Sequence, residues 1–469
     1  MWQTAADWAD AEFRGVPGLE KRLQDRLVTT AAGLAARPDG TLPHRFDWAD
    51  LKGAYRLVHA ASANPDAIQE VHRERTRARA VGCRRPVLFV HDTTQLDFSG
   101  HPAVADQLGP IGDGAAAARG FLQHNSLAVD PGGSALLGVI HQQTFLRTPK
   151  PAGEGRAARY HRADRESEVW VRGIEAVGRP PAGACWVHVG DRGADFYGAM
   201  AAAVDRGCHF LFRLCQDRRA EDAGGALTHV MAAARGVAAT CPAEVEVASR
   251  GGRPARTAKV QLGAVRVTIA PPHAESRWRG RAPLGVTVVR VWEPDPPAGV
   301  EPLEWVLGTD RAGVAAADLQ AYRGWYEWRW PTAEEYHKAQ KTGCRVEDLR
   351  FATADRLRAA IALVGVVAAR VLALRWQRDG CPDAPVAAVA DAREVEAIAG
   401  VSRGKAAPAT VKGFVDAVAK LGGYLGRKCD GPPGWQSLWR GYQRLADIVL
   451  GLDIARRRDH PAPHDVGKR

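Results

Sequence analysis

Two short apolar runs, each followed within two residues by an aspartate, constrain the fold of this chain most strongly. Residues 87–90 lead to Asp92, and residues 185–189 lead to Asp191. Runs of this length and apolar content are typical of buried strands. Helical spacing over residues 165–177 separates them, and strands that alternate with helices predict an α/β layer with a largely buried sheet.

Between about residues 222 and 310 the apolar pattern changes to a period of two, with Gly- and Pro-rich turns between the runs. This pattern predicts an antiparallel β insertion within the α/β domain. Both ends of the chain follow helical spacing instead. We therefore expect three parts, with a tail that is disordered after Asp453: a helical domain at 1–75, an α/β domain at 76–375 and a helical C-terminal domain with a basic tail at 376–469.

The charge balance favours a polyanionic partner. The chain of 469 residues carries 64 basic and 53 acidic side chains, a formal net charge of +11, and nucleic acid is the commonest partner of such a surplus. Its eight cysteines are scattered without zinc spacing, which predicts reduced thiols in a cytoplasmic protein. The longest apolar run, at 359–369, suits a buried helix and is too short to span a membrane.

Asp92 and Asp191 are candidate ligands for metal ions. Mg²⁺ prefers carboxylate oxygens, and two ions about 4 Å apart can activate an attacking oxygen and stabilise a leaving one. Carboxylates at strand ends are well placed to meet at one edge of a sheet. Structural roles remain open at both positions, because Asp92 could form a turn with the amides that follow it and Asp191 could cap a helix.

A third acidic element follows at residues 326–342. Glu334 and Lys341 lie seven residues apart, on nearly the same face of a helix, so the carboxylate could hold a metal while the cation holds a phosphate. His337 and Lys338 are candidates for further phosphate contacts. Pro331 and the Thr332/Glu335 pair predict a new helix start with a capping box. A solvated, salt-bridged surface helix is the alternative.

The N-terminal helices carry a basic set of side chains. These residues could lie on a DNA backbone or in a groove, or they could simply form a solvated helix face. The set is Lys21, Arg22, Arg26, Lys52 and Arg56.

Several motifs, in order along the chain, resemble bacterial cut-and-paste DDE transposases of the Tn-five type, within the IS-four group. They are Leu51-Lys-Gly-Ala-Tyr-Arg56, Leu88-Phe-Val-His-Asp-Thr-Thr94, Leu108-Gly-Pro-Ile-Gly112 with residues 120–124, Leu137-Gly-Val-Ile-His-Gln142, Asp191-Arg-Gly-Ala-Asp195, Trp305-Val-Leu-Gly-Thr309 and residues 334–342.

The resemblance implies a ribonuclease H-like α/β core with the β insertion, flanked by helical domains. It makes Asp92, Asp191 and Glu334 the catalytic residues, holding two Mg²⁺ ions, with Mn²⁺ as an alternative. It also implies that Trp305 stacks on a flipped base, although a plain core position is as compatible with the sequence.

The family signature has Tyr, two residues, Arg, three residues, Glu, six residues and Lys. Tyr326, Arg329, Glu334 and Lys341 follow it, except that four residues separate Arg329 from Glu334. The match implies that Tyr326 and Arg329, like Lys341, contact DNA phosphates. One extra helical residue would turn Arg329 about 100° from the Glu334 face. Alternatively, Pro331 absorbs the change by starting a new helix.

The implied function is transposition by a homodimer that joins paired DNA ends in the bacterial cytoplasm, at the nucleoid and without a membrane. The protein would bind the terminal inverted repeats of a mobile element, cleave the DNA, form a hairpin and transfer the strand into target DNA. Two alternatives stay open: a hydrolytic nuclease on the same core, and a catalytically inactive DNA-binding protein derived from a transposase.

Overall fold

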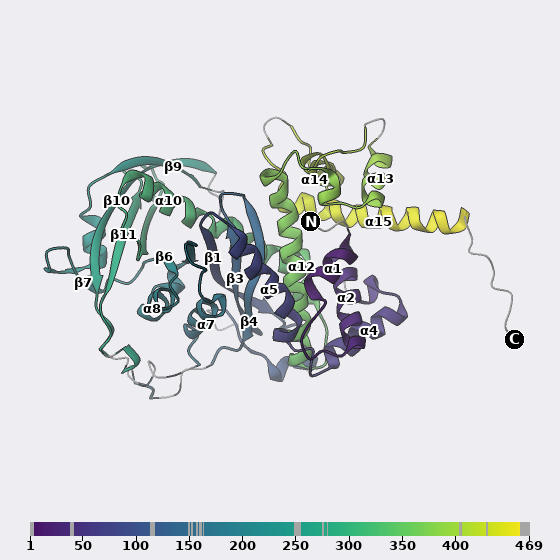
Figure 1. Cartoon of the computed structure of the whole chain (residues 1–469), viewed down its shortest axis with the longest axis horizontal. Helices are drawn as coiled ribbons and strands as arrows, with labels where there is room; N and C mark the ends of the chain where they lie inside the picture. Colours follow the sequence, from purple (N-terminus) through teal and green to yellow (C-terminus); the bar gives the residue numbers. More distant parts are fainter. Residues whose placement is uncertain are drawn as a thin grey trace.

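A single mixed sheet of 12 strands forms the centre of the protein, with helices on its faces and at both ends of the chain (Figure 1). The computed structural model describes residues 4–37, 42–112, 118–148, 151, 153–155, 158, 162, 164–247, 255–273, 276–278, 280–402, 406–427 and 430–459. The predicted combination of an α/β sheet and helical ends is therefore confirmed.

The central strands run in the order β4-β3-β1-β5-β6. β1 pairs antiparallel with β3 and parallel with β5, and β5 pairs parallel with β6. Their apolar side chains explain the burial, since Val87 to Val90 of β1 are inaccessible to solvent. The five strands are β1 (Val87–Asp97), β3 (Arg119–Asp130), β4 (Ala135–Phe145), β5 (Trp186–Gly190) and β6 (His209–Arg213).

β1 continues well past Asp92, so the expectation that this strand stops there is wrong. The long strand β3 pairs with β1 as far as Asp97 and keeps it extended. Pairing with β5 nevertheless ends at Val90. Asp92 thus lies just beyond the end of its parallel neighbour, while β5 itself ends at Gly190, directly before Asp191, as predicted.

The β insertion extends the same sheet, because β12 pairs antiparallel with β6. The period-two pattern predicted for this part corresponds to extended strands, the longest of which is β10. The remaining strands are β2 (Gly109–Pro110), β7 (Arg219–Glu221), β8 (Leu227–His229), β9 (Cys241–Val247), β10 (Arg256–Ile269), β11 (Leu284–Trp292) and β12 (Glu304–Thr309).

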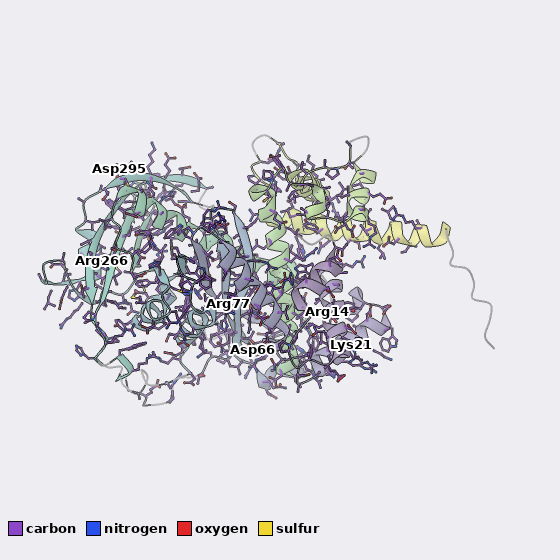
Figure 2. All side chains as sticks on the ribbon, in the orientation of Figure 1. Arg14, Lys21, Asp66, Arg77, Arg266 and Asp295 are labelled. Carbon is purple, nitrogen blue, oxygen red and sulfur yellow. The ribbon has the colours of Figure 1, made fainter. Side chains whose placement is uncertain are left out.

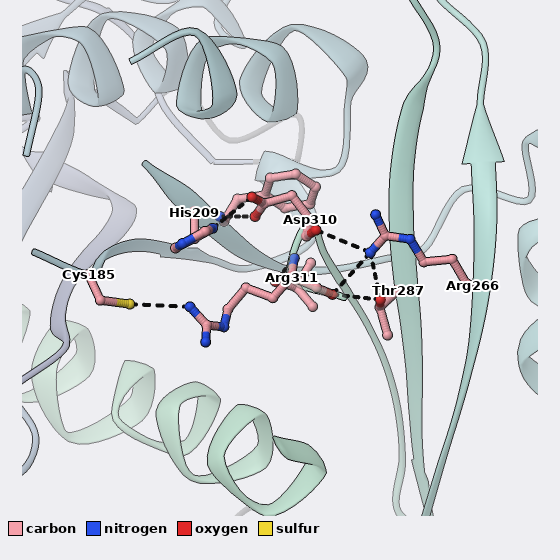
Figure 3. A network of polar contacts seen from close by, with 8 residues as sticks. Cys185, His209, Arg266, Thr287, Asp310 and Arg311 are labelled. Atoms are coloured by element: carbon pink, nitrogen blue, oxygen red, sulfur yellow. Dashed lines mark hydrogen bonds and ion pairs between the residues drawn. The ribbon is translucent and has the colours of Figure 1, made fainter. Parts of the chain in front are cut away.

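A polar network fastens the insertion to the central strands (Figure 3). Asp310, after β12, accepts hydrogen bonds from the Phe210 amide at 2.9 Å and lies 2.7 Å from Nδ1 of His209. Arg266 of β10 donates to the backbone carbonyls of Asp310 and Arg311, both at 3.1 Å. These bonds fix the start of β6 against the far strands of the sheet.

Helices cover both faces of the central strands. Alternate residues of a strand point to opposite faces, and β3 shows this directly: His124 lies against α7, whereas Asn125 lies toward α11 and α12. The helices are α1 (Ala5–Phe13), α2 (Lys21–Ala36), α3 (Leu42–Arg45), α4 (Trp48–His59), α5 (Pro65–Gly82), α7 (Glu168–Val177), α8 (Tyr197–Asp205), α9 (Val230–Arg235), α10 (Ala316–Glu327), α11 (Glu335–Lys338), α12 (Ala354–Gly380), α13 (Ala392–Val401), α14 (Val411–Leu421) and α15 (Trp435–Asp459).

Helix α12 is the longest apolar element and packs on β4, α5 and α2. It is long and apolar enough to cross a membrane, but 78% of its most apolar stretch is buried inside the protein, as expected of a core helix. The burial of residues 359–369 was predicted.

The C-terminal helices α13, α14 and α15 share a separate apolar cluster that includes Phe414, Val418 and Leu438. The disorder expected after Asp453 is wrong as far as Asp459, because α15 continues to that residue. The rest of the basic tail lies outside the described residues.

Candidate active site

A pocket of about 660 Å³ opens where β5 and β6 end, beside the helical segment that follows β12. It collects side chains from positions up to 250 residues apart in the sequence, and most of its surface is polar. All eight residues predicted for the catalytic, metal and phosphate roles line it: Asp92, Asp191, Tyr326, Arg329, Glu334, His337, Lys338 and Lys341.

The three carboxylates influence one another electrostatically. Burial and the negative charges of Asp191 and Glu334 raise the pKa of Asp92 to about 7, against the opposing effect of Arg329. A raised carboxylate pKa in a concave, polar site is a recognised mark of a functional centre. Burial is the largest of these effects, so Asp92 is a desolvated carboxylate within the pocket.

The structural roles considered for the two aspartates are also present. The Thr93 amide donates to Oδ1 of Asp92 at 2.8 Å, and the Gly193 amide donates to Oδ1 of Asp191 at 2.8 Å. Each bond orients its carboxylate from the backbone. A turn or cap at these positions thus helps to fix a side chain that lines the pocket.

Arg329 lies in the pocket, so the extra residue before Glu334 does not turn it away from the Glu334 face. Its guanidinium donates to Oδ2 of Asp92 at 3.0 Å, and both side chains are mostly buried. Burial lowers the pKa of Arg329, but Asp92, Tyr326, Asp191 and Glu334 together outweigh this effect, and the net change is a rise.

A π-helical turn explains how Arg329 and Glu334 share one pocket. The segment Trp330–Glu334 (η4) is π-helical, with a second π turn at Ala339–Gly343 (η5). A π turn accommodates one more residue than an α turn. Pro331 has no N–H for an α-helical bond, so the wider turn forms where that bond is already missing.

The predicted helix start at Pro331 and its capping box are therefore wrong. The backbone stays helical through Arg329 and Glu334. Thr332 is buried, and its hydroxyl has no hydrogen-bond partner among the described residues. Glu335 forms an ion pair with Arg375 of α12 instead of a cap. That ion pair holds the helix carrying Glu334 against the core.

Trp305 lies at the edge of this site, on β12, and is half-buried. Its ring meets Tyr326 edge-on, with the ring centroids 5.4 Å apart. Burial raises the pKa of Tyr326, whose ring also lines the pocket. Trp305 thus packs on the core and borders the site at once, and its contact with a base stays a prediction.

The other predicted phosphate contacts differ in character. Burial, with Lys341 and Arg329 nearby, lowers the pKa of His337 to about 3, so its ring is neutral. Lys338 is exposed at the pocket. Lys341 Nζ lies 3.6 Å from Oε1 of Glu347, a contact that water and salt can readily exchange.

The wall behind Asp92 consists of neutral histidines. His91 lies 2.8 Å from His188 and 2.8 Å from Ser126, and its ring stacks with His124. Burial lowers the pKa of His188 to about 3, and it lowers those of His91 and His124 as well. The acidic side of the pocket therefore receives no positive charge from this face.

The basic N-terminal residues lie outside the pocket. Lys21, Arg22, Lys52 and Arg56 are exposed and Arg26 is half-buried. Figure 2 shows Lys21 on the N-terminal helices, far from the β insertion, where Arg266 and Asp295 are labelled. Beside Lys52 lies Trp48, which is 69% exposed and which the sequence reading missed.

Sequence reasoning also missed several residues of the pocket, among them Arg192, Arg213 and Trp330. Arg192 follows Asp191 directly, and Arg213 ends β6, the strand next to β5. Both could have been found from the rule that the carboxyl ends of parallel strands gather at one edge. Trp330 had no comparable signal, because its position depends on the π turn.

The carboxylates supply the oxygen donors that Mg²⁺ prefers. In this conformation, however, no three His, Cys, Asp or Glu side chains of the described ranges lie close enough together to hold an ion. Arg329 takes the Oδ2 atom of Asp92 that a metal would need. The donor chemistry suits a divalent cation, but holding an ion requires that the guanidinium leave Asp92 and that the carboxylates come closer together.

Two family models match the two ends of the chain. Residues 5–63 match the model described as transposase DNA-binding, and residues 366–460 match the model described as transposase Tn5 dimerisation domain. The first match covers helices α1 to α4, and the second runs from the middle of α12 to the end of α15. With both ends matched in this order around the α/β sheet and its pocket, the chain belongs to the transposases of the Tn5 type.

Proposed function

We propose that this transposase cleaves DNA and transfers strands at the pocket, with Asp92, Asp191 and Glu334 as the catalytic carboxylates. The observation that carries the proposal is the convergence of these three residues from distant positions into one pocket with arginines and lysines. The strand order β4-β3-β1-β5-β6, with only β3 reversed relative to β1, β4, β5 and β6, supports a ribonuclease H-like core for residues 76–375.

The three carboxylates would hold two Mg²⁺ ions, or Mn²⁺ in their place, and the ions would activate the attacking oxygen and stabilise the leaving one. Lys338 and Lys341 provide charge for the phosphates on either side of the cut. When DNA binds, the Arg329 guanidinium leaves Asp92 and donates to a DNA phosphate instead, which frees Oδ2 of Asp92. Tyr326 and Trp305 form the aromatic edge on which an extruded base can stack.

The order of reactions follows from which oxygen attacks. Water first breaks a phosphodiester and leaves a 3′-hydroxyl. That hydroxyl attacks the opposite strand, which closes a hairpin, and after hairpin opening it attacks the target. Each joining step exchanges one phosphodiester for another, so no nucleotide cofactor is consumed.

The ends of the chain would supply binding and assembly. The helices of residues 1–75 bind the terminal inverted repeats through Lys21, Arg22, Arg26, Lys52 and Arg56, and the helices of residues 376–469 join two copies on paired ends. Such a protein works on the bacterial nucleoid, in the cytoplasm. The family-model matches at both ends support this assignment.

The experiment uses duplexes that carry the repeats flanking the gene itself, with a supercoiled target plasmid and Mg²⁺. Asp92→Asn, Asp191→Asn and Glu334→Gln should each lose cleavage and joining, while Glu327→Gln, which removes an acid of the same segment outside the pocket, should retain both. Loss of activity in Glu327→Gln alone would overturn the assignment. Cleavage without joined products in the wild type would favour a hydrolytic nuclease, and no cleavage at all would favour an inactive DNA-binding protein.

A further inference from the structure

A chain of buried amides runs from helix α5 through the sheet to His337. Gln69 of α5, Gln142 of β4 and Asn125 of β3 are almost inaccessible to solvent. Their side chains follow one another at hydrogen-bond distance and end at Nε2 of His337, which lies 3.2 Å from Nδ2 of Asn125. None of these amides belongs to the carboxylate set of the pocket.

A backbone carbonyl fixes the orientation of every amide in this chain. Nε2 of Gln69 donates to the carbonyl oxygen of Ala362 at 2.8 Å, and a carbonyl can only accept. The same nitrogen donates to Oε1 of Gln142 at 2.9 Å, so Nε2 of Gln142 is left to donate to Oδ1 of Asn125 at 2.9 Å. Nδ2 of Asn125 must therefore face His337 as a donor.

Two contacts hold Gln142 in place. Nε2 of Gln142 lies 2.9 Å from the hydroxyl oxygen of Tyr336, and that hydroxyl donates to the carbonyl of Gly365 at 3.1 Å. A Cβ at Gly365 would lie only 2.6 Å from the Gln142 amide, so α12 approaches this closely only because the residue is glycine. The orientation of Asn125 is thus set by contacts that originate in α5, β4 and α12.

The position of the proton on His337 follows. Because Nε2 accepts a hydrogen bond from Asn125, the proton of the neutral ring is on Nδ1. The described part of the chain offers Nδ1 no hydrogen-bond acceptor, and His337 lines the pocket. The ring therefore presents a fixed N–H donor at the place where DNA phosphates are expected.

We propose that Asn125 is a positioning residue that holds His337 as the Nδ1–H tautomer, so that His337 donates a neutral hydrogen bond to a phosphate oxygen of bound DNA. This inference rests on the proposed function for the nature of the ligand. The tautomer itself is a property of the free protein and can be tested even if the protein proves inactive.

The first test is nitrogen NMR of the full chain labelled with ¹⁵N-histidine. His72 and His101 also accept hydrogen bonds from backbone amides at Nε2, so each of them should likewise be unprotonated at Nε2. The wild type should show a further histidine with a protonated Nδ1 and an unprotonated Nε2, and that signal alone should vanish in His337→Gln. In Asn125→Ala the same ring should shift toward the Nε2–H form. A wild-type His337 that carries its proton on Nε2 would overturn the proposal, whether or not the alanine variant folds.

The second test uses two amides that mimic the two ring nitrogens. An asparagine side chain places its N–H near the position of Nδ1, and a glutamine side chain reaches the position of Nε2. His337→Asn should cleave repeat-end DNA within about 10-fold of the wild type, and His337→Gln should lose about 10- to 100-fold, the range expected for a lost bond to a charged group.

His229→Asn, at the exposed end of β8 on the far edge of the sheet, is the matched control and should change nothing. Equal losses in His337→Asn and His337→Gln would refute the donor role even if the tautomer is as stated. Failure of the proposed function gives a different result, because the wild type would then show no cleavage while its NMR signal is unchanged.

Discussion

Two polar clusters lie at opposite edges of the same parallel strands. One is the pocket, beyond the ends of β5 and β6, and the other surrounds Asp310, at the start of those strands. Both contain carboxylates and arginines. In the Asp310 cluster the carboxylate contacts Nδ1 of His209 and the Phe210 amide. Arg266 donates a hydrogen bond to the Asp310 backbone carbonyl, so the donors and acceptors of this cluster pair with one another (Figure 3).

The pocket differs because its carboxylates face one another. Burial is the largest cause of the raised pKa of Asp92; Asp191 and Glu334 add to it, and Arg329 opposes it. A cluster whose polar groups pair with one another serves the fold, whereas a buried carboxylate with a raised pKa in a polar pocket is typical of a functional site. The comparison between these two clusters can be sharpened by experiment.

The largest contrast is expected from removing one carboxylate charge at each edge. Asp92→Asn should reduce DNA cleavage by about 1,000-fold or more, as is common for a lost group of the reaction centre, without lowering the unfolding temperature. Asp310→Asn should leave cleavage within a few-fold and lower the free energy of unfolding by about 1–3 kcal/mol, because it weakens buried hydrogen bonds. Loss of stability in Asp92→Asn together with loss of cleavage in Asp310→Asn would show that the two clusters do not divide catalytic and structural roles in this way.

The second-largest effect is expected in the pH dependence of the free energy of unfolding, which should differ between the wild type and Asp92→Asn. The pKa of Asp92 rises from 3.8 to about 7 on folding, so the folded protein holds this proton more tightly than the unfolded chain. The stabilisation is present below about pH 4 and is lost as the pH rises through 7, at up to about 1.4 kcal/mol per pH unit. In EDTA, Asp92→Asn should lack this loss, as urea unfolding at pH 5 and pH 8 would show.

A smaller effect is expected from removing Arg329, whose guanidinium occupies Asp92 when neither metal nor DNA is bound. Arg329→Ala should raise the affinity of the DNA-free protein for Mn²⁺ by about tenfold, roughly 1.4 kcal/mol, because Oδ2 of Asp92 loses its partner. Electron paramagnetic resonance of free Mn²⁺ measures the change. Arg311→Ala, in the Asp310 cluster, should have no effect on it. An unchanged affinity in both variants would show that Arg329 does not compete with the metal.

The smallest effect concerns the π turn. Deleting Ala333 leaves three residues between Arg329 and Glu334, a spacing that keeps both on one face of an ordinary α-helix. We expect cleavage within about 10-fold of the wild type and an unchanged unfolding temperature, because only the bulge is removed. A deletion variant as inactive as Asp92→Asn would mean that the bulge itself is required by the pocket.

The sequence allowed the pocket to be predicted better than the local backbone around it. Asp92 and Asp191 could be found because apolar runs precede them, and apolar periodicity depends only on burial. The length of β1 could not, since its partner β3 keeps it extended. The π turn depends on which bonds form around Pro331, so a reading of α-helical spacing placed Arg329 and Glu335 wrongly. Arg213 ends β6, the parallel neighbour of β5, and the gathering of such strand ends at one edge would have pointed to it.

Helix α12 has a consequence for how this protein can be divided. Its first half packs beside the amides that orient Asn125, through Ala362 and Gly365, and the C-terminal family match begins at residue 366, inside the same helix. Cutting the chain at residue 366 would divide α12 and expose its buried apolar side chains. It would also free the Ala362 carbonyl, which orients the Gln69 amide. One continuous helix thus belongs both to the part that matches the dimerisation model and to the packing around the amides that orient Asn125.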